Sequence, residues 1–259
     1  MRKHYNVAII GGGAAGIAAA VAAAKYSSKV VLIDSNTLLG GMATRAYVGT
    51  ICGIAPNHIG YSGNPQIMLP GFGGEFVTAL ADHSKSEPRR NRSGMVFLPY
   101  KLESFISVTK TVLGTLPNLD LELGSNVTTV EFDPINKYFQ VSLLAERQSR
   151  SFDVDRIVDC SGHAIPSKLL GIEYIKVKNP QVSAIVFRLS NIPPFEEEHL
   201  ALTIKKEILS AAQIEELDIQ KFEISYIPGS YRDSSAYFKL ALPDVRTPEG
   251  GNNKTFKAA

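Results

Sequence analysis

The hydrophobic and polar positions near the start of the chain form two short apolar runs separated by an alanine-rich run. Residues 6–10 and 29–33 have the composition of strands that are buried on both faces of a parallel sheet. Residues 14–25 are rich in alanine, which favours a helix. The order strand, helix, strand predicts a βαβ unit and therefore an α/β fold with a parallel sheet.

The middle of the chain changes its period. Residues 99–116 place apolar side chains near helical spacing, and the three runs that follow them have the composition of strands. These three strands are expected at 126–132, 138–145 and 151–158. Turn-forming residues at 133–137 predict a hairpin between the first two strands. We therefore expect a helix, then a three-stranded antiparallel meander whose last strand returns to the parallel sheet.

The last third of the chain predicts a second, smaller α+β part. The elements expected there are a strand at 181–189, a helix at 196–217, and strands at 222–227 and 236–242. The end of the chain is polar and rich in turn residues, which is typical of disorder. The predicted parts are a first domain over 1–175, a partial substrate or cap domain over 176–246, and a disordered tail over 247–259.

Glycines connect the first predicted strand to the first predicted helix. Gly11, Gly13 and Gly16 satisfy the pattern G-x-G-x-x-G at this position. Gly11 permits a tight turn, Gly13 lets the backbone approach a pyrophosphate, and Gly16 lets the helix lie close to the sheet. The N–H groups at the helix start, those of Ala14 and Ala15 among them, favour a phosphate charge.

Asp34 supplies the second part of the same fingerprint. It ends the second apolar run, where a carboxylate can accept hydrogen bonds from an adenosine ribose, and Ser35 follows it. Together with the glycines, this arrangement predicts a dinucleotide-binding site. One alternative is a glycine-rich turn in another kind of α/β protein. The other is a secretory signal peptide, because a basic start precedes the apolar run.

Three further segments decide between FAD and NAD. Residues 40–45, Gly-Gly-Met-Ala-Thr-Arg, resemble the second phosphate-binding segment of glutathione-reductase-like flavoproteins. The meander resembles the insertion that these flavoproteins carry, and residues 157–162, Ile-Val-Asp-Cys-Ser-Gly, resemble the turn that lies near their FAD. Together with residues 48–53, these segments resemble a broad family of bacterial FAD-dependent oxidoreductases over roughly the first 175 residues.

The resemblance implies bound FAD, redox activity, and a Rossmann-like FAD-binding domain in which a parallel sheet continues into an antiparallel meander. The cofactor-binding residues predicted by the fingerprint and the resemblance are Gly11, Gly13, Ala14, Ala15, Gly16, Asp34, Ser35, Gly40, Gly41, Met42, Ala43, Thr44, Arg45, Val127, Ser161 and Gly162. Residues 163–166 depart from the Gly- and Asp-rich stretch of the family, and nothing after Ser230 resembles its carboxy-terminal return to the FAD domain. A fragment, a chain completed by a partner and a shortened family member are the three explanations.

No set of catalytic residues stands out in the sequence. Cys52 and His163 are the candidates, because a thiol near the flavin can exchange electrons with it or attack a substrate, and His163 follows the turn near the flavin. The ordinary alternatives are that Cys52 only packs against its neighbours and that His163 is a surface or loop residue. His58 is a further candidate acid or base, and Tyr61 and Arg45 are candidates for holding an anionic substrate.

Charge and cysteine content limit the partners and the compartment. The net charge of +2 does not favour a nucleic-acid partner, and Arg89, Arg90 and Arg92 fit a solvated loop. No stretch has the character of a membrane span. Cys52 and Cys160 form neither a C-x-x-C pair nor a metal site, which favours reduced thiols in a cytoplasmic protein.

The sequence therefore predicts an FAD-dependent oxidoreductase that transfers a hydride or electrons between FAD and a small organic substrate. One alternative is an FAD-binding subunit or truncated, inactive flavoprotein that requires a partner chain, and another is an NAD-dependent dehydrogenase. A second G-x-G-x-x-G is absent from the sequence. The electrons would therefore come from the substrate, from a transiently bound nicotinamide, or from an electron-transfer protein.

Overall fold

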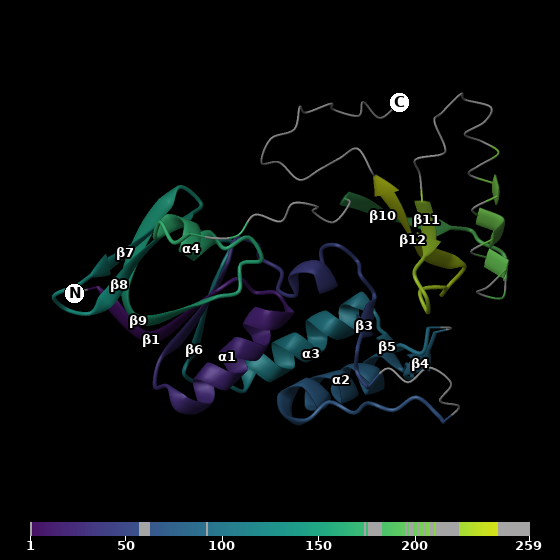
Figure 1. The fold of residues 1–259 in the computed structure, drawn as a ribbon, viewed down its shortest axis with the longest axis horizontal. Coiled ribbons are helices and arrows are strands. Elements are labelled where there is room, and N and C mark those ends of the chain that lie inside the picture. Colours follow the sequence, from purple (N-terminus) through teal and green to yellow (C-terminus); the bar gives the residue numbers. More distant parts are fainter. Residues whose placement is uncertain are drawn as a thin grey trace. The chain divides into compact units, whose positions relative to one another are not determined.

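The computed structural model describes two compact units of the chain, Met1–Tyr174 and Ile175–Ala259 (Figure 1). The described residues are 2–56, 63–91, 93–173, 183–194 and 223–242, with positions 175, 196, 199–200, 202–204, 206–207 and 210. The expected tail at 247–259 lies outside the described residues, as does the end of the helix expected at 196–217.

The first unit is built on a six-stranded sheet with the strand order β6-β2-β1-β9-β8-β7. The strands are β1 (Lys3–Ile10), β2 (Val30–Asp34), β6 (Leu119–Leu123), β7 (Asn126–Asp133), β8 (Tyr138–Ala145) and β9 (Gln148–Asp159). β1 pairs in parallel with β2 and with β9, and β2 pairs in parallel with β6. β8 and β7 continue the sheet beyond β9 as an antiparallel meander. The predicted Rossmann-like fold is confirmed.

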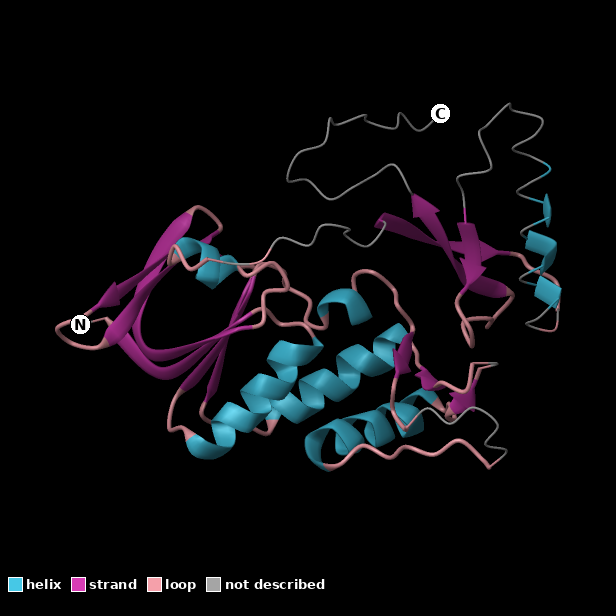
Figure 2. Ribbon diagram, viewed as in Figure 1, coloured by secondary structure: helices cyan, strands magenta, loops and turns pink. Residues whose placement is uncertain are grey.

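The central strands are apolar throughout because both faces of the sheet are covered. Ile9 and Leu32 belong to a core cluster on one face, whereas Ala8 and Val31 belong to a second cluster on the other face. Helices α1 (Ala14–Tyr26), α2 (Gly71–Ser84) and α3 (Leu102–Gly114) contribute to the first cluster. Figure 2 shows α1 and α3 side by side against the sheet, and their contacts agree with the view. Residues of β8 and β9 contribute to the second cluster.

A small antiparallel sheet corrects two expectations. Its strands are β3 (Thr50–Cys52), β4 (Arg89–Arg90) and β5 (Val96–Pro99), in the order β3-β5-β4. Pro99, expected to begin a helix at 99–116, belongs instead to the end of β5, and α3 begins only at Leu102. Arg89 and Arg90 lie in a strand rather than a solvated loop, because β4 pairs with β5; Arg92 lies outside the described residues.

The second unit contains an antiparallel sheet in the order β10-β12-β11. Its strands are β10 (Ser183–Ser190), β11 (Glu223–Tyr226) and β12 (Ser235–Leu242), with described helical positions between 199 and 210. Leu200 packs with Ile192, Ala236 and Phe238 in a separate buried cluster. The predicted α+β character of this part is thereby confirmed.

Candidate functional site

Three turns meet where β1, β2 and β9 end. In the sheet register, Ile10 lies opposite both Ile33 and Asp159, so the segments that follow these residues leave the sheet at the same edge. From β1 the chain passes through α1 to β2 on one side, while β9 lies on the other side. This is the edge at which open parallel sheets bind ligands, at the point where the strand order reverses.

The first turn depends on two glycines. Gly11 has a φ of +108°, and a Cβ at this position would overlap the carbonyl group of Cys160. A Cβ at Gly16 would overlap the carbonyl oxygen of Gly11, so the helix lies directly against the turn. Both are the close backbone approaches for which a G-x-G-x-x-G turn needs glycine.

The amino terminus of α1 is open and lacks a compensating charge. Gly13 is its N-cap and provides no side-chain hydrogen bond, and the first turn of the helix contains no acidic residue. Ala14 and Ala15 are exposed, and a Cβ built on Gly13 would meet no atom within 4 Å. The first N–H groups of a helix have no partner within the helix and carry its positive end. This part of the site therefore fits a diphosphate.

The second turn holds the Asp34 carboxylate beside the first. The Gly12 N–H donates to Asp34 Oδ2 at 2.6 Å, and both the N–H and the side-chain amide of Asn36 donate to Asp34 Oδ1, at 2.8 and 2.9 Å. Ser35 is exposed next to it. A carboxylate has about four acceptor positions, so Asp34 retains capacity for ribose hydroxyls. Sequence reasoning missed Asn36, although an Asp-x-Asn turn is a known way to hold an aspartate.

The structure brings the predicted second phosphate-binding segment against the first turn. The Gly40 N–H donates to the Gly12 carbonyl at 2.8 Å, and Gly13 and Gly40 form a parallel β-bridge. A Cβ at Gly41 would lie 3.2 Å from the Gly13 Cα. Glycine pairs on both sides therefore let two backbone segments run close together, with Met42 and Arg45 exposed beyond them.

Two side chains hold this second segment from the inside. Thr44 is 1% exposed, and its hydroxyl donates to the Leu39 carbonyl at 2.9 Å. The side chain of Thr44 thus braces the segment and does not reach the surface, where a phosphate would lie. The Tyr100 hydroxyl donates to the Ala43 carbonyl at 2.8 Å, and burial raises the pKa of Tyr100, which keeps this hydroxyl a donor. Sequence reasoning missed Tyr100, which follows β5 and carries no motif.

The third turn, Cys160 to Gly162, is tied to the first turn and to β9. The Cys160 N–H donates to the Ile10 carbonyl at 2.8 Å, and the Ser161 hydroxyl donates to Asp159 Oδ1 at 2.8 Å. Gly162 has a φ of +73°. The Ser161 Oγ accepts the N–H of Ile165, which begins the short helix α4 (Ile165–Leu169). Ser161 therefore shapes this turn through contacts within the protein.

The remaining predicted residues are dispersed. Val127 is half-buried against the second core cluster, near the start of β7. This start lies close to Asp34, because the Ser125 N–H donates to the Asp34 carbonyl at 3.0 Å. Cys52 is exposed on β3 and His163 is exposed after the third turn. Burial, with Asp159 nearby, raises the pKa of the Cys160 thiol. His58 and Tyr61 lie outside the described residues.

Two features are absent from the described residues, a metal site and a membrane-spanning helix. In that part of the chain, no group of three or more His, Cys, Asp or Glu side chains is placed to hold a metal ion. No helix formed by these residues is long and apolar enough to cross a membrane.

The chain matches the model of the family described as FAD dependent oxidoreductase over residues 6–255. It belongs to this family. Its members depend on FAD, which confirms the predicted cofactor over the NAD-dependent alternative. Comparison with curated proteins finds no match for this chain.

Solved structures share the fold of this chain. A geranylgeranyl bacteriochlorophyll reductase-like protein from Thermoplasma acidophilum aligns over 93% of this chain and 57% of its own, with 15% identity and a TM-score of 0.55. PqsL from Pseudomonas aeruginosa, in complex with 2-aminobenzoylacetate, aligns over 93% of this chain and 61% of its own, with 15% identity and a TM-score of 0.53. The Diels-Alderase of pyrroindomycin biosynthesis aligns over 97% of this chain and 49% of its own, with 12% identity and a TM-score of 0.52. The chain thus spans about half to three fifths of these proteins, and the likeness is one of fold.

Proposed function

We propose that this chain holds FAD across the three turns and uses it to oxidise or reduce a small organic substrate. The observation that carries the proposal is the uncapped start of α1, where Gly13, Ala14 and Ala15 present backbone and no acidic side chain competes for the helix terminus. A diphosphate placed there would face backbone N–H groups and the positive end of the helix.

The other contacts follow from the arrangement around this helix. Asp34 would accept hydrogen bonds from the hydroxyls of the adenosine ribose, beside Gly12. The backbone at Gly40 and Gly41 would approach the diphosphate from the other side, with the Arg45 cation nearby. Ser161 and Gly162 would border the cofactor beyond Gly11. Bound FAD supplies the hydride or electron transfer, while the protein binds it and orients the substrate.

The candidates for substrate chemistry stay predictions. Cys52 and His163 are exposed, and a role for either depends on where the substrate lies. A possible partner chain and the cytoplasmic compartment likewise stay predictions from the sequence.

The first experiment is to purify the chain, record its visible spectrum and identify the released cofactor by mass. We expect the bands of oxidised flavin, release of FAD, and reversible bleaching by dithionite. A colourless protein that takes up no added FAD would contradict the proposal for this chain. FAD retained only with a co-purifying chain would favour the FAD-binding subunit.

The variant Gly13→Ala tests the placement of the diphosphate. Gly13 has a φ of −73° and open space around a Cβ, so alanine fits the fold, but its methyl group would stand where the diphosphate approaches. We expect a loss of FAD affinity of at least about tenfold with unchanged thermal stability. Gly73→Ala, which also meets no atom within 4 Å, is the matched control and should bind FAD normally. Equal affinity in both variants would place the diphosphate elsewhere.

A further inference from the structure

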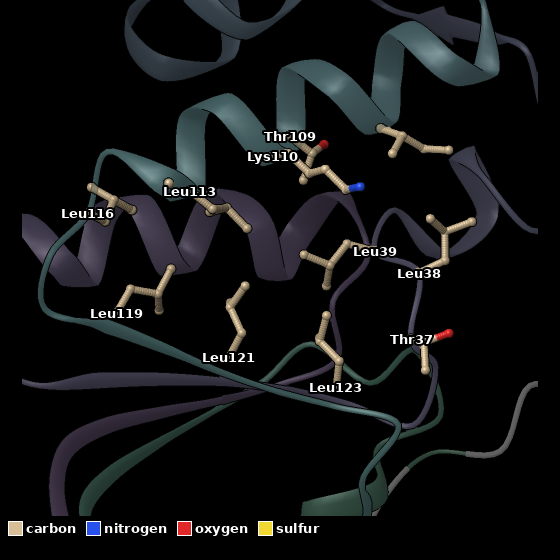
Figure 3. A pocket seen from close by; sticks show the side chains of 12 residues that line it. Thr37, Leu38, Leu39, Thr109, Lys110, Leu113, Leu116, Leu119, Leu121 and Leu123 are labelled. Carbon is tan, nitrogen blue, oxygen red and sulfur yellow. The ribbon is translucent and has the colours of Figure 1, made fainter.

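A groove lined by leucines lies between α3 and the edge strand β6. Its volume is about 350 Å³, which is within the range of small-molecule sites. Figure 3 shows Leu119, Leu121 and Leu123 extending from β6 toward Leu113 and Leu116 of the α3 side. The remaining wall is the segment Thr37–Leu39, which follows β2.

The alternation of β6 explains why its leucines face the groove. Asp120 and Glu122 point to the opposite face of the sheet, where the Asp120 carboxylate accepts the Lys3 ammonium and the Tyr5 hydroxyl. Glu122 accepts a hydrogen bond from Arg150 on the same face. Since successive residues of a strand face opposite sides, the leucines between them gather on the face of α3. β6 ends the sheet, so the groove is open along this edge.

The groove is apolar but carries one charge. Lys110 is the single ionisable residue among the residues that line it, and Figure 3 shows its side chain extending from α3 toward Leu38. No carboxylate among the described residues forms an ion pair with Lys110. Leu121 is 46% exposed, so apolar surface at the groove remains in contact with water. Covering it with an aliphatic chain is favourable, and an anionic head group would complement the ammonium.

We propose that this groove binds an aliphatic monocarboxylate of medium chain length, with its tail among the leucines and its carboxylate at Lys110. The site is distinct from the proposed FAD site, because none of the residues predicted to bind FAD lines it. The segment Thr37–Leu39 lies between the two, since it connects Asp34 to Gly40 and lines the groove. The Leu39 side chain also lies against the first turn, because a Cβ at Gly12 would overlap Leu39 Cδ2. The proposal therefore stands whether or not the three turns bind FAD.

A chain-length series tests the tail. The whole protein is titrated calorimetrically with hexanoate, octanoate and decanoate below their micelle concentrations. We expect saturable one-to-one binding whose affinity rises about tenfold for every two methylene groups, as burial of the tail requires. Affinity that is independent of chain length, or no saturable binding of decanoate, would overturn the proposal.

The head group is tested with a cation and with two matched lysine variants. Decyltrimethylammonium has the same tail and should bind at least about tenfold more weakly than decanoate. Lys110→Met should remove this difference, whereas Lys101→Met, which replaces an exposed lysine just before α3, should retain it. Equal binding of both head groups to the unaltered protein would show that Lys110 does not recognise the ligand.

Leu121→Trp tests the location. The side chain is half-exposed, so tryptophan can be accommodated, and it should fill the groove and reduce decanoate affinity at least about tenfold. Circular dichroism and retained FAD affinity report that the fold and the proposed cofactor site are intact. Unchanged decanoate binding would place the ligand elsewhere. A dimer in sedimentation that Leu121→Asp dissociates would identify the groove as a contact between two copies and overturn the proposal.

Discussion

The edge with the three turns and the leucine groove border the same segment of chain, Thr37–Leu39, but they are formed by different kinds of atoms. At the edge, the surfaces are backbone: glycines let Gly11 approach Cys160 and let Gly40 bond to Gly12. In the groove, the surfaces are side chains that α3 and β6 bring together from different parts of the sequence. A site made of backbone tolerates no added atom at its closest contacts, whereas an open groove tolerates changes in its lining.

Gly11→Ala should produce the largest effect at the edge with the three turns, because it adds a methyl group against the Cys160 carbonyl at a φ of +108°. We expect a loss of about 2–4 kcal/mol in the free energy of unfolding. Urea denaturation measures it. Gly53→Ala has a φ of +74° but open space, and should cost only the backbone strain, about 1–2 kcal/mol. Equal costs would mean that strain, not the close approach, makes glycine necessary at the turn.

The two cysteines should differ in their reaction with iodoacetamide. Cys52 is exposed, whereas Cys160 is half-buried and burial raises its pKa, so less of it is thiolate at pH 8. We expect Cys160 in the Cys52→Ser variant to react at least about tenfold more slowly than Cys52 in the Cys160→Ser variant. The difference between the two reaction rates should narrow as the pH rises through the pKa of Cys160, because the Cys160 thiolate then forms.

Mass spectrometry follows both alkylation rates, and added FAD should slow Cys160 further, since this residue lies against Gly11. Similar rates at pH 8 without FAD would show that the edge opens far more readily than its packing indicates.

Tyr100→Phe should have a smaller effect that is centred on the second segment. It removes the hydroxyl that donates to the Ala43 carbonyl, with an expected cost of about 1 kcal/mol in unfolding free energy. Because the segment at 40–44 would be held less firmly, FAD affinity should fall several-fold in a fluorescence titration. Tyr26→Phe is the matched control, since Tyr26 is 90% exposed, and should change neither quantity. Unaltered FAD affinity in Tyr100→Phe would show that the hydrogen bond from Tyr100 to Ala43 does not contribute to cofactor binding.

Leu121→Ala should have the smallest effect, and it tests the leucine groove instead of the edge with the three turns. Because its side chain is 46% exposed, truncation should cost less than about 1 kcal/mol in thermal or urea unfolding. Leu113 lines the same groove but is only 4% exposed, so Leu113→Ala should cost about 2–4 kcal/mol. Similar losses in the two variants would mean that the groove is closed in solution.

The fold was most predictable where one local pattern decided it. The strands β1 and β2 are buried on both faces, so they are apolar without interruption, and the turn at 133–137 marked the hairpin of β7 and β8. Helix α2 and the sheet of β3, β4 and β5 were missed. Their strands are only two to four residues long, too short for a period, and β3 pairs with a strand that lies more than forty residues further along the chain.

By itself, the sequence determined the family, the cofactor and the course of the central strands, because glycine spacing and contiguous apolar runs are local properties of the chain. Only the tertiary structure decided that the Thr44 hydroxyl turns inward to Leu39, that Tyr100 braces Ala43, and that the leucines of β6 face α3. A side chain's direction and partners depend on which distant segments pack against it. That packing minimises exposed apolar surface and unpaired polar groups over the whole unit, and no single stretch of sequence records its outcome.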